Sequence, residues 1–312
     1  MLVLPKSFTF LFISFCLYFL VAPTLRSSAQ PFLYHDSVMK KDLAAYQSKA
    51  IALVNATDTS KPSPHWPSIV PHLFWRNVRQ NVLQPQSVNQ GKSTNFCGYA
   101  AFTHILVSYR PDIYVATIIQ LYTEGKAAFP KKKLHPDNRV KKAAGTLRNK
   151  GVLDANHADQ LWFLTLADQF KGYLNWIDQS YKPGDENTLW AATNFSKFNR
   201  MLRVIGDYTL EAAGSDMLRP MRGNTLEYLQ AKQQEGIVLL YLNSKFLHPT
   251  RFTLFKLRAP THFVVLYEVF ETPYGIEFKY WDYGLKTAQQ LTPKRLRKII
   301  FGISTIIPGH EK

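Results

Sequence analysis

The stretch Gln90-Gly91-Lys92-Ser93-Thr94-Asn95-Phe96-Cys97-Gly98-Tyr99-Ala100-Ala101 organises this chain around one cysteine. A polar loop that contains glycine is followed at once by an apolar run, a pattern that predicts a helix beginning at Cys97. The unpaired N–H groups and the dipole at the start of a helix favour the thiolate form of a cysteine. The sequence therefore predicts a reactive thiol at a helix N-terminus.

Two later stretches supply a histidine and a carboxylate that suit a base and its orienting partner. His262 lies near the start of residues 260–267, whose β-branched and aromatic side chains predict a buried strand. After a turn at residues 273–275, residues 276–284 predict the returning strand, which ends near Asp282. On paired or neighbouring strands, we expect Asp282 to accept a hydrogen bond from Nδ1 of His262 and to stabilise the charged ring.

These residues occur in an order that resembles a known superfamily. The pattern is Gln…Cys-Gly-x-Ala on a helix, then His opening an apolar strand, then Asp followed by an aromatic residue and Gly. It is similar to the papain-like cysteine peptidases, especially to bacterial branches such as the bacteriocin-processing peptidase-like domains. The resemblance covers residues 85–125 and 225–307 and does not cover residues 126–224.

The resemblance implies a role for each of four residues. Cys97 would be the nucleophile, His262 the general acid and base, and Asp282 the residue that orients His262. Gln90 would donate to the oxyanion hole beside the backbone N–H of Cys97. The family's glutamine lies one residue closer to the cysteine, so Asn89, Asn95 and Gln86 are alternatives to Gln90.

The first 29 residues predict a secretory signal peptide. Lys6 forms a short basic start, residues 8–21 form an apolar core, and small residues precede a cleavage site before Gln30. An uncleaved anchor is the alternative, although the apolar run is short for a span of about 20 residues. Cys16 lies in the apolar core, so cleavage leaves Cys97 as the sole cysteine. We expect a secreted or periplasmic protein, without a stable membrane span after cleavage, whose lone thiol is either a nucleophile or a free buried cysteine.

The chain is strongly basic. Its formal net charge is +16, and removing a leader that carries Lys6, Arg26 and no acid lowers this charge by two, to +14. Such a charge favours anionic partners, for example cell-wall polymers, membrane surfaces or acidic proteins. Residues 126–150 are especially rich in lysine and arginine, and they form either a solvated face or a rim that holds an anionic substrate. No nucleic-acid-binding motif accompanies the charge, so we expect no specific nucleic-acid partner.

The sequence lacks the motifs of several other classes of site. It has no His-Glu-x-x-His, no paired cysteines in the mature chain and no carboxylate-rich metal loop. It also has no phosphate-binding loop, no dinucleotide fingerprint and no Gly-x-Ser-x-Gly elbow. We therefore expect neither a metal nor a cofactor.

The periodicity of the apolar residues predicts an α+β fold, and the resemblance makes it a papain-like one, with a helical half that carries the nucleophile packed on an antiparallel sheet. Residues 30–85 form an N-terminal extension or a prosegment, and residues 86–312 form the catalytic domain. Within that domain, a helical insertion over about residues 126–224 is either a subdomain or a cap over the cleft. The expected helices are 36–54, 97–109, 112–124, 137–150, 157–176, 188–213, 225–234 and 294–300, and the other expected strands are 237–242 and 302–307.

The function that these expectations imply is an exported thiol hydrolase that cleaves amide bonds, most simply peptide bonds. Its substrate would be a peptide, a protein or a cell-wall polymer. One alternative is an acyltransferase of the transglutaminase-like type, because such enzymes arrange Cys, His and Asp in the same order. The other alternative is a papain-like scaffold that binds a partner and has an idle thiol. The reaction product and the reactivity of Cys97 distinguish these three classes.

Overall fold

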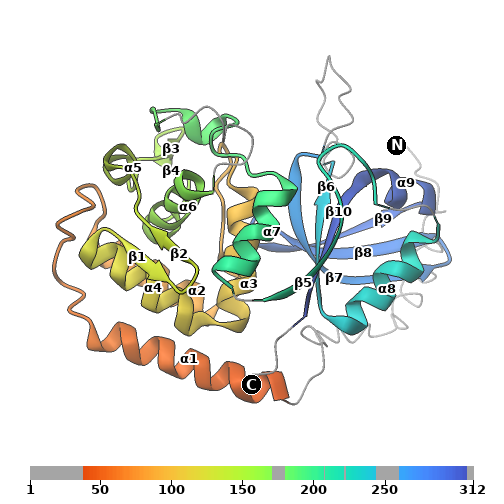
Figure 1. Ribbon diagram of the computed structural model, residues 1–312, viewed down its shortest axis with the longest axis horizontal. Coiled ribbons are helices and arrows are strands. Elements are labelled where there is room, and N and C mark those ends of the chain that lie inside the picture. The colour runs from red at the N-terminus through yellow and green to blue at the C-terminus, as the bar shows by residue number, and fades with distance from the viewer. Residues whose placement is uncertain (1–37, 171–179, 207, 221–222, 244–259, 308–312) are drawn as a thin grey trace, which may run out of the picture. The chain divides into compact units, whose positions relative to one another are not determined.

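The structure is a computed structural model that describes residues 38–170, 180–206, 208–220, 223–243 and 260–307. The expected leader, with Cys16, lies outside these residues. Within them, no helix combines the length and the apolar character needed to cross a membrane. Helices and strands segregate along the chain, with helices dominating the first half and a sheet dominating the second (Figure 1). The expectation of an α+β fold is confirmed.

The helical half is built around the helix that begins at Cys97. Helix α3 packs against α4, α6 and α2, while α1 packs along α4. Pro111 stands in the first turn of α4, where its missing N–H costs nothing, and Gly125 ends that helix in the left-handed conformation with φ 68°. The bounds of these helices are α1 Val38–Ala56, α2 Pro71–Leu83, α3 Cys97–Tyr109, α4 Pro111–Glu124 and α6 His157–Gln169.

Helix α2, which the sequence pattern did not predict, is tied to α6 by a buried polar network. Asn81 donates to a carboxylate oxygen of Asp159 over 2.8 Å, and Asn77 donates to the other oxygen over 3.3 Å. The side-chain oxygen of Asn77 also accepts from the backbone N–H of Asp159. All three side chains are buried. Residues 71–83 therefore belong to the same compact unit as the rest of the described chain.

The sheet has six strands in the order β5-β10-β6-β7-β8-β9, and every neighbouring pair is antiparallel. The central strand β6 is buried along its whole length, which explains its continuous apolar sequence. The strand bounds are β5 Thr209–Gly214, β6 Ile237–Leu242, β7 His262–Thr272, β8 Gly275–Asp282, β9 Leu285–Leu291 and β10 Ile300–Ile307.

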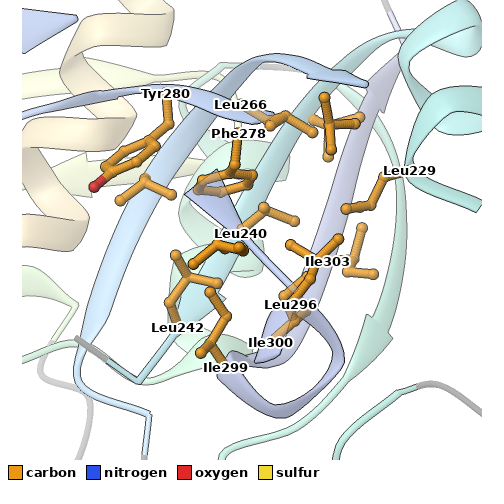
Figure 2. Packing of buried hydrophobic residues seen from close by; sticks show 14 of the residues in the cluster. Leu229, Leu240, Leu242, Leu266, Phe278, Tyr280, Leu296, Ile299, Ile300 and Ile303 are labelled. Carbon is orange, nitrogen blue, oxygen red and sulfur yellow. The ribbon is translucent and has the colours of Figure 1, made fainter. Parts of the chain in front are cut away.

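Helices cover both faces of this sheet. On one face, α8 (Thr225–Glu235) and α9 (Pro293–Ile299) bury their apolar residues against Leu240, Leu266 and Phe278 (Figure 2). On the other face, α3 packs against β7, and the ring of Phe198 from α7 (Phe195–Val204) stacks on Phe263 at 4.5 Å. Alternate residues of each strand face opposite sides, so one strand serves both cores. This arrangement holds α3 against the strand that begins with His262.

The predicted helical insertion at residues 126–224 is only partly helical. Besides the helices α5 (Asn138–Ala143), α6 and α7, it contains two small hairpins. The hairpin of β1 (Ala127–Phe129) with β2 (Lys132–Leu134) precedes α5, and that of β3 (Arg148–Asn149) with β4 (Val152–Leu153) lies between α5 and α6. The expected helices over 137–150 and 188–213 are wrong in extent. Residues 209–214 form β5 instead, because antiparallel pairing with β10 supplies hydrogen bonds that local periodicity does not reveal. The insertion thus contributes an edge strand to the main sheet.

Strand β9 was also absent from the sequence prediction. Its residues, Leu-Lys-Thr-Ala-Gln-Gln-Leu, are largely polar because β9 is the edge strand of the sheet and most of its side chains are exposed or half-buried. The strand exists because the two-residue turn after Asp282 brings it back along β8. This turn lies beside the candidate site.

Candidate active site

Cys97 is the first residue of α3 and is a partly exposed, free thiol. The preceding residue, Phe96, caps the helix without any side-chain hydrogen bond to its first turn. No capping side chain at Phe96 therefore satisfies the N–H groups of that turn. The Sγ atom lies 3.7 Å from the backbone oxygen of Thr261, the residue just before β7. The predicted helix over 97–109 is confirmed, and it delivers the thiol to the start of that strand.

Gly98 permits the close approach of two neighbouring segments to this helix turn. A Cβ atom added at Gly98 would lie 2.3 Å from Cγ2 of Thr193 and 3.1 Å from the ring of Phe263. The first contact would force Thr193 to shift, and the second would require the ring of Phe263 to give way by a few tenths of an ångström. The glycine of the Cys-Gly pair is therefore required by packing against the insertion and against β7.

His262 and Asp282 lie at the same end of the sheet, because β7 begins with His262 and the antiparallel β8 ends with Asp282. The register pairs Val265 with Trp281, which places Asp282 diagonally across from His262 on the same side of the ladder. Nε2 of His262 and Oδ1 of Asp282 are 2.6 Å apart, and both side chains are buried. The side chain of Cys97 lies close enough to His262 to raise the pKa of its ring. The structure thus brings Cys97, His262 and Asp282 together.

The nitrogen that binds Asp282 is Nε2, not the Nδ1 atom expected from the sequence. The reason is the strand register. A diagonal neighbour is about 7–8 Å away at its Cα atom, so its carboxylate meets the outer nitrogen of the ring rather than the inner one. Nδ1 is therefore the ring nitrogen left for Cys97.

The pKa of His262 is shifted strongly by this arrangement. Burial of the ring opposes its positive charge, but hydrogen bonds to Asp282 and Cys97 and the negative charge of both partners outweigh burial and raise the pKa of His262 to about 10. Conversely, burial lowers the pKa of His104 to about 4, against the hydrogen bond to the Pro85 carbonyl. The two histidines therefore differ in charge at neutral pH.

Histidine NMR tests this difference directly. We expect the ring of His262 to stay charged from its ordinary pKa of 6.5 up to about 10, and that of His104 to stay neutral down to about 4. Because the folded pKa of His262 lies above the unfolded one, its contribution to stability is present below pH 6.5 and is lost as the pH rises through about 10. The measurement is a titration of ring ¹³C shifts. Asp282→Asn should return His262 toward its ordinary value, and a wild-type His262 that titrates near 6.5 would contradict the assigned contacts.

Tyr283 and Gly284 form the tight turn that holds Asp282 in place. Tyr283 has φ 49° and Gly284 has φ 77°, the left-handed pair that a two-residue type I′ hairpin turn requires. A positive φ is unusual for a tyrosine. Its ring stacks on His262 with centroids 5.2 Å apart and planes 19° apart. Tyr283 therefore covers one face of the imidazole, a contact that sequence reasoning did not predict.

Gln90 is buried seven residues before Cys97 in the loop that leads to α3. Its backbone oxygen accepts from the hydroxyl of Thr94 over 2.6 Å. Of the alternatives, Asn95 donates its side-chain amide to the carbonyls of residues 187 and 188, so it is engaged elsewhere. The side-chain oxygen of Asn89 accepts from the N–H of Gly91. Gln90 therefore remains the most buried of the candidate amides.

His104, two turns after Cys97, has a structural role and is not part of the proposed triad. Its Nδ1 donates to the Pro85 carbonyl over 3.0 Å, so Nε2 accepts from the hydroxyl of Tyr267 over 3.2 Å. Its ring stacks on Trp281 at 4.6 Å, and the indole N–H of Trp281 donates to the carbonyl of Gln86. These contacts fix β8 just before Asp282.

No protein-family model, no curated protein and no solved structure matches this chain. Among the described residues, no group of three or more His, Cys, Asp or Glu side chains is arranged to hold a metal ion.

Proposed function

We propose that this protein is a papain-like thiol hydrolase that cleaves amide bonds, with Cys97, His262 and Asp282 as its catalytic triad. The observation that carries the proposal is the placement of His262 beside Cys97, which raises the pKa of its ring, and against Oδ1 of Asp282, to which its Nε2 is hydrogen-bonded. A buried histidine that is held by a carboxylate and bonded to a cysteine at a helix start favours the thiolate–imidazolium pair. Export of the mature chain through the residue 1–29 leader belongs to the same proposal.

Each step of the reaction has a residue to perform it. The Cys97 thiolate attacks the carbonyl carbon, a C–S bond forms, and the carbonyl oxygen becomes an oxyanion. The backbone N–H of Cys97 and the Gln90 amide would donate to that oxyanion. His262 gives its proton to the amine as the C–N bond breaks, and it then takes a proton from the water that hydrolyses the thioester. The products are a carboxylic acid, an amine and the free enzyme.

Product analysis tests the proposal. The full-length protein, purified after expression, is incubated with a defined peptide mixture in ¹⁸O-labelled water, with Cys97→Ser as the matched control. We expect new peptide C-termini that carry ¹⁸O only with the wild-type chain. A parallel reaction contains excess ethanolamine. If ethanolamine adducts outrun hydrolysis, the activity is acyl transfer, and the hydrolase proposal is wrong.

If neither the hydrolysis product nor the ethanolamine adduct forms, the reactivity of Cys97 decides the interpretation. If iodoacetamide labels Cys97 no faster than free cysteine and neither product forms, the papain-like scaffold with an idle thiol is the better description. A Cys97→Ser variant that forms ¹⁸O-labelled products at the wild-type rate would equally overturn the assignment of the nucleophile. In both cases the folded state of each sample is verified by circular dichroism.

A further inference from the structure

The loop that carries the nucleophile is held by a carboxylate from the insertion. Asp154 lies between β4 and α6. Its Oδ1 accepts from the backbone N–H of Lys92 over 2.6 Å, and its Oδ2 accepts from the backbone N–H of Ser93 over 3.0 Å. The hydroxyl of Ser93 also donates to Oδ2. One side chain therefore fixes two consecutive peptide units of the loop.

Gly91 allows the Asp154 side chain to approach the loop closely. It adopts φ 92°, and a Cβ atom there would lie 2.8 Å from Cγ of Asp154 and 2.9 Å from its backbone oxygen. Only glycine combines a left-handed conformation with such a close approach at little cost. Successive N–H groups after a left-handed residue form a concave site that suits an anion. Here the anion is the side chain of Asp154.

A second part of the insertion holds the other end of the same loop. The backbone N–H of Asn95 donates to the carbonyl of Glu186 over 2.8 Å. The side-chain amide of Asn95 donates to the carbonyls of Asn187 and Thr188 over 2.8 Å and 3.0 Å. The loop therefore runs between two anchors that residues 126–224 provide, and Cys97 follows two residues after the second anchor. Asp154 is the charged one of these anchors.

From these contacts we infer that Asp154 is a positioning residue for the oxyanion hole of the proposed enzyme, an inference that rests on the proposed function. The clamped peptide units lie between Gln90 and Cys97, which are the two proposed donors to the oxyanion. The position of each donor therefore depends on the conformation of residues 91–93. Asp154 acts through geometry, because three hydrogen bonds satisfy its charge where it binds. In this way the insertion would position the loop between Gln90 and Cys97.

Two reagents that react with the same sulfur separate positioning from thiol reactivity. Iodoacetamide alkylates a thiolate by direct displacement and forms no oxyanion. p-Nitrophenyl acetate acylates the thiolate through a tetrahedral oxyanion, after which the C–O bond breaks and p-nitrophenolate leaves. The loss of one oxyanion donor slows such acyl transfer by about 10²–10³-fold. The ratio of acylation rate to alkylation rate at Cys97 therefore reports on the oxyanion hole, once the Cys97→Ser background is subtracted.

The key variant is Asp154→Ala in the full chain. We expect its acylation rate to fall at least about tenfold while its alkylation rate changes by less than about threefold, because misplaced donors cost transition-state stabilisation and leave the thiolate in place. Ser93→Ala removes one of the three bonds and should lower the ratio by a smaller factor. This milder variant also decides the question if Asp154→Ala does not fold.

The matched control is Asp137→Ala. Asp137 also lies in the insertion and also accepts a backbone N–H, that of Arg139 over 2.7 Å, as the cap of α5. Its loss should cost a comparable amount of stability and leave the ratio unchanged. If folded Asp154→Ala or Ser93→Ala keeps the ratio of the Asp137→Ala control, the inference about Asp154 is wrong. If wild-type Cys97 shows neither rapid alkylation nor an acylation burst, the proposed function itself fails.

Discussion

Replacing His262 with alanine should slow alkylation of Cys97 by iodoacetamide at least about tenfold at about pH 7. An ordinary thiol is only a few per cent thiolate at neutral pH, whereas a thiolate paired with a charged imidazole is almost fully ionised. Part of the gain is lost because a stabilised thiolate is a weaker nucleophile. The substitution removes the interaction between His262 and Cys97 that raises the pKa of the ring. The rate is measured by mass spectrometry of the intact chain.

The dependence of this rate on pH is a sharper test than the rate at one pH. In the wild-type chain we expect the rate to change across about pH 10, the pKa at which His262 loses its charge. In His262→Ala that change should be absent, because no charged ring remains beside the thiol. Equal profiles in the two folded proteins would show that His262 does not activate Cys97.

Two controls separate activation from damage to the fold. Removing His262 takes away the ring that pairs with the buried carboxylate of Asp282, which costs about 3–5 kcal/mol of stability. Asp282→Asn keeps the shape of the side chain without its charge, and it should slow alkylation by a smaller factor. His72→Ala, an exposed histidine at the start of α2, should leave both the rate and its pH profile unchanged.

The sequence predicted those parts of the site that local patterns determine. A polar loop before an apolar run located the start of α3 at Cys97, and a β-branched run located β7 at His262. Both signals depend only on residues close in sequence. The strand pairing that brings Asp282 to His262 was also predicted from the sequence, because a short turn joins two adjacent antiparallel strands.

What the sequence did not predict depends on contacts between distant segments. The Nε2 contact of Asp282 follows from the exact register of β7 and β8, which periodicity does not define. The clamp of Asp154 on the loop before Cys97 joins residues about sixty positions apart, and no local signal marks an aspartate that binds a remote backbone. Strand β5 formed where a helix was expected, because its pairing partner, β10, lies far from it in the sequence. Tertiary pairing overrides propensity in such cases.

Gly98→Ala should destabilise the protein by about 1–3 kcal/mol, even though alanine is normally the better helix residue by about 1 kcal/mol. The new methyl group would lie 2.3 Å from Cγ2 of Thr193 and 3.1 Å from the ring of Phe263. Phe263 is packed between Phe198 and Tyr241, so it has little room to move. The measurement is the free energy of unfolding in urea.

Thr193→Ser supplies the matching rescue, because it removes only the Cγ2 methyl group that would clash. By itself this change should cost little, whereas combined with Gly98→Ala it should restore at least about half of the lost stability. Residues in direct contact show coupling energies of about 0.5–3 kcal/mol in such a double-mutant cycle. The double variant should also be alkylated at Cys97 at about the wild-type rate, since the contact between residues 98 and 193 places helix α3 against the insertion. Strictly additive effects of the two substitutions would mean that residues 98 and 193 are not in contact, and that the insertion does not position the turn that carries the thiol.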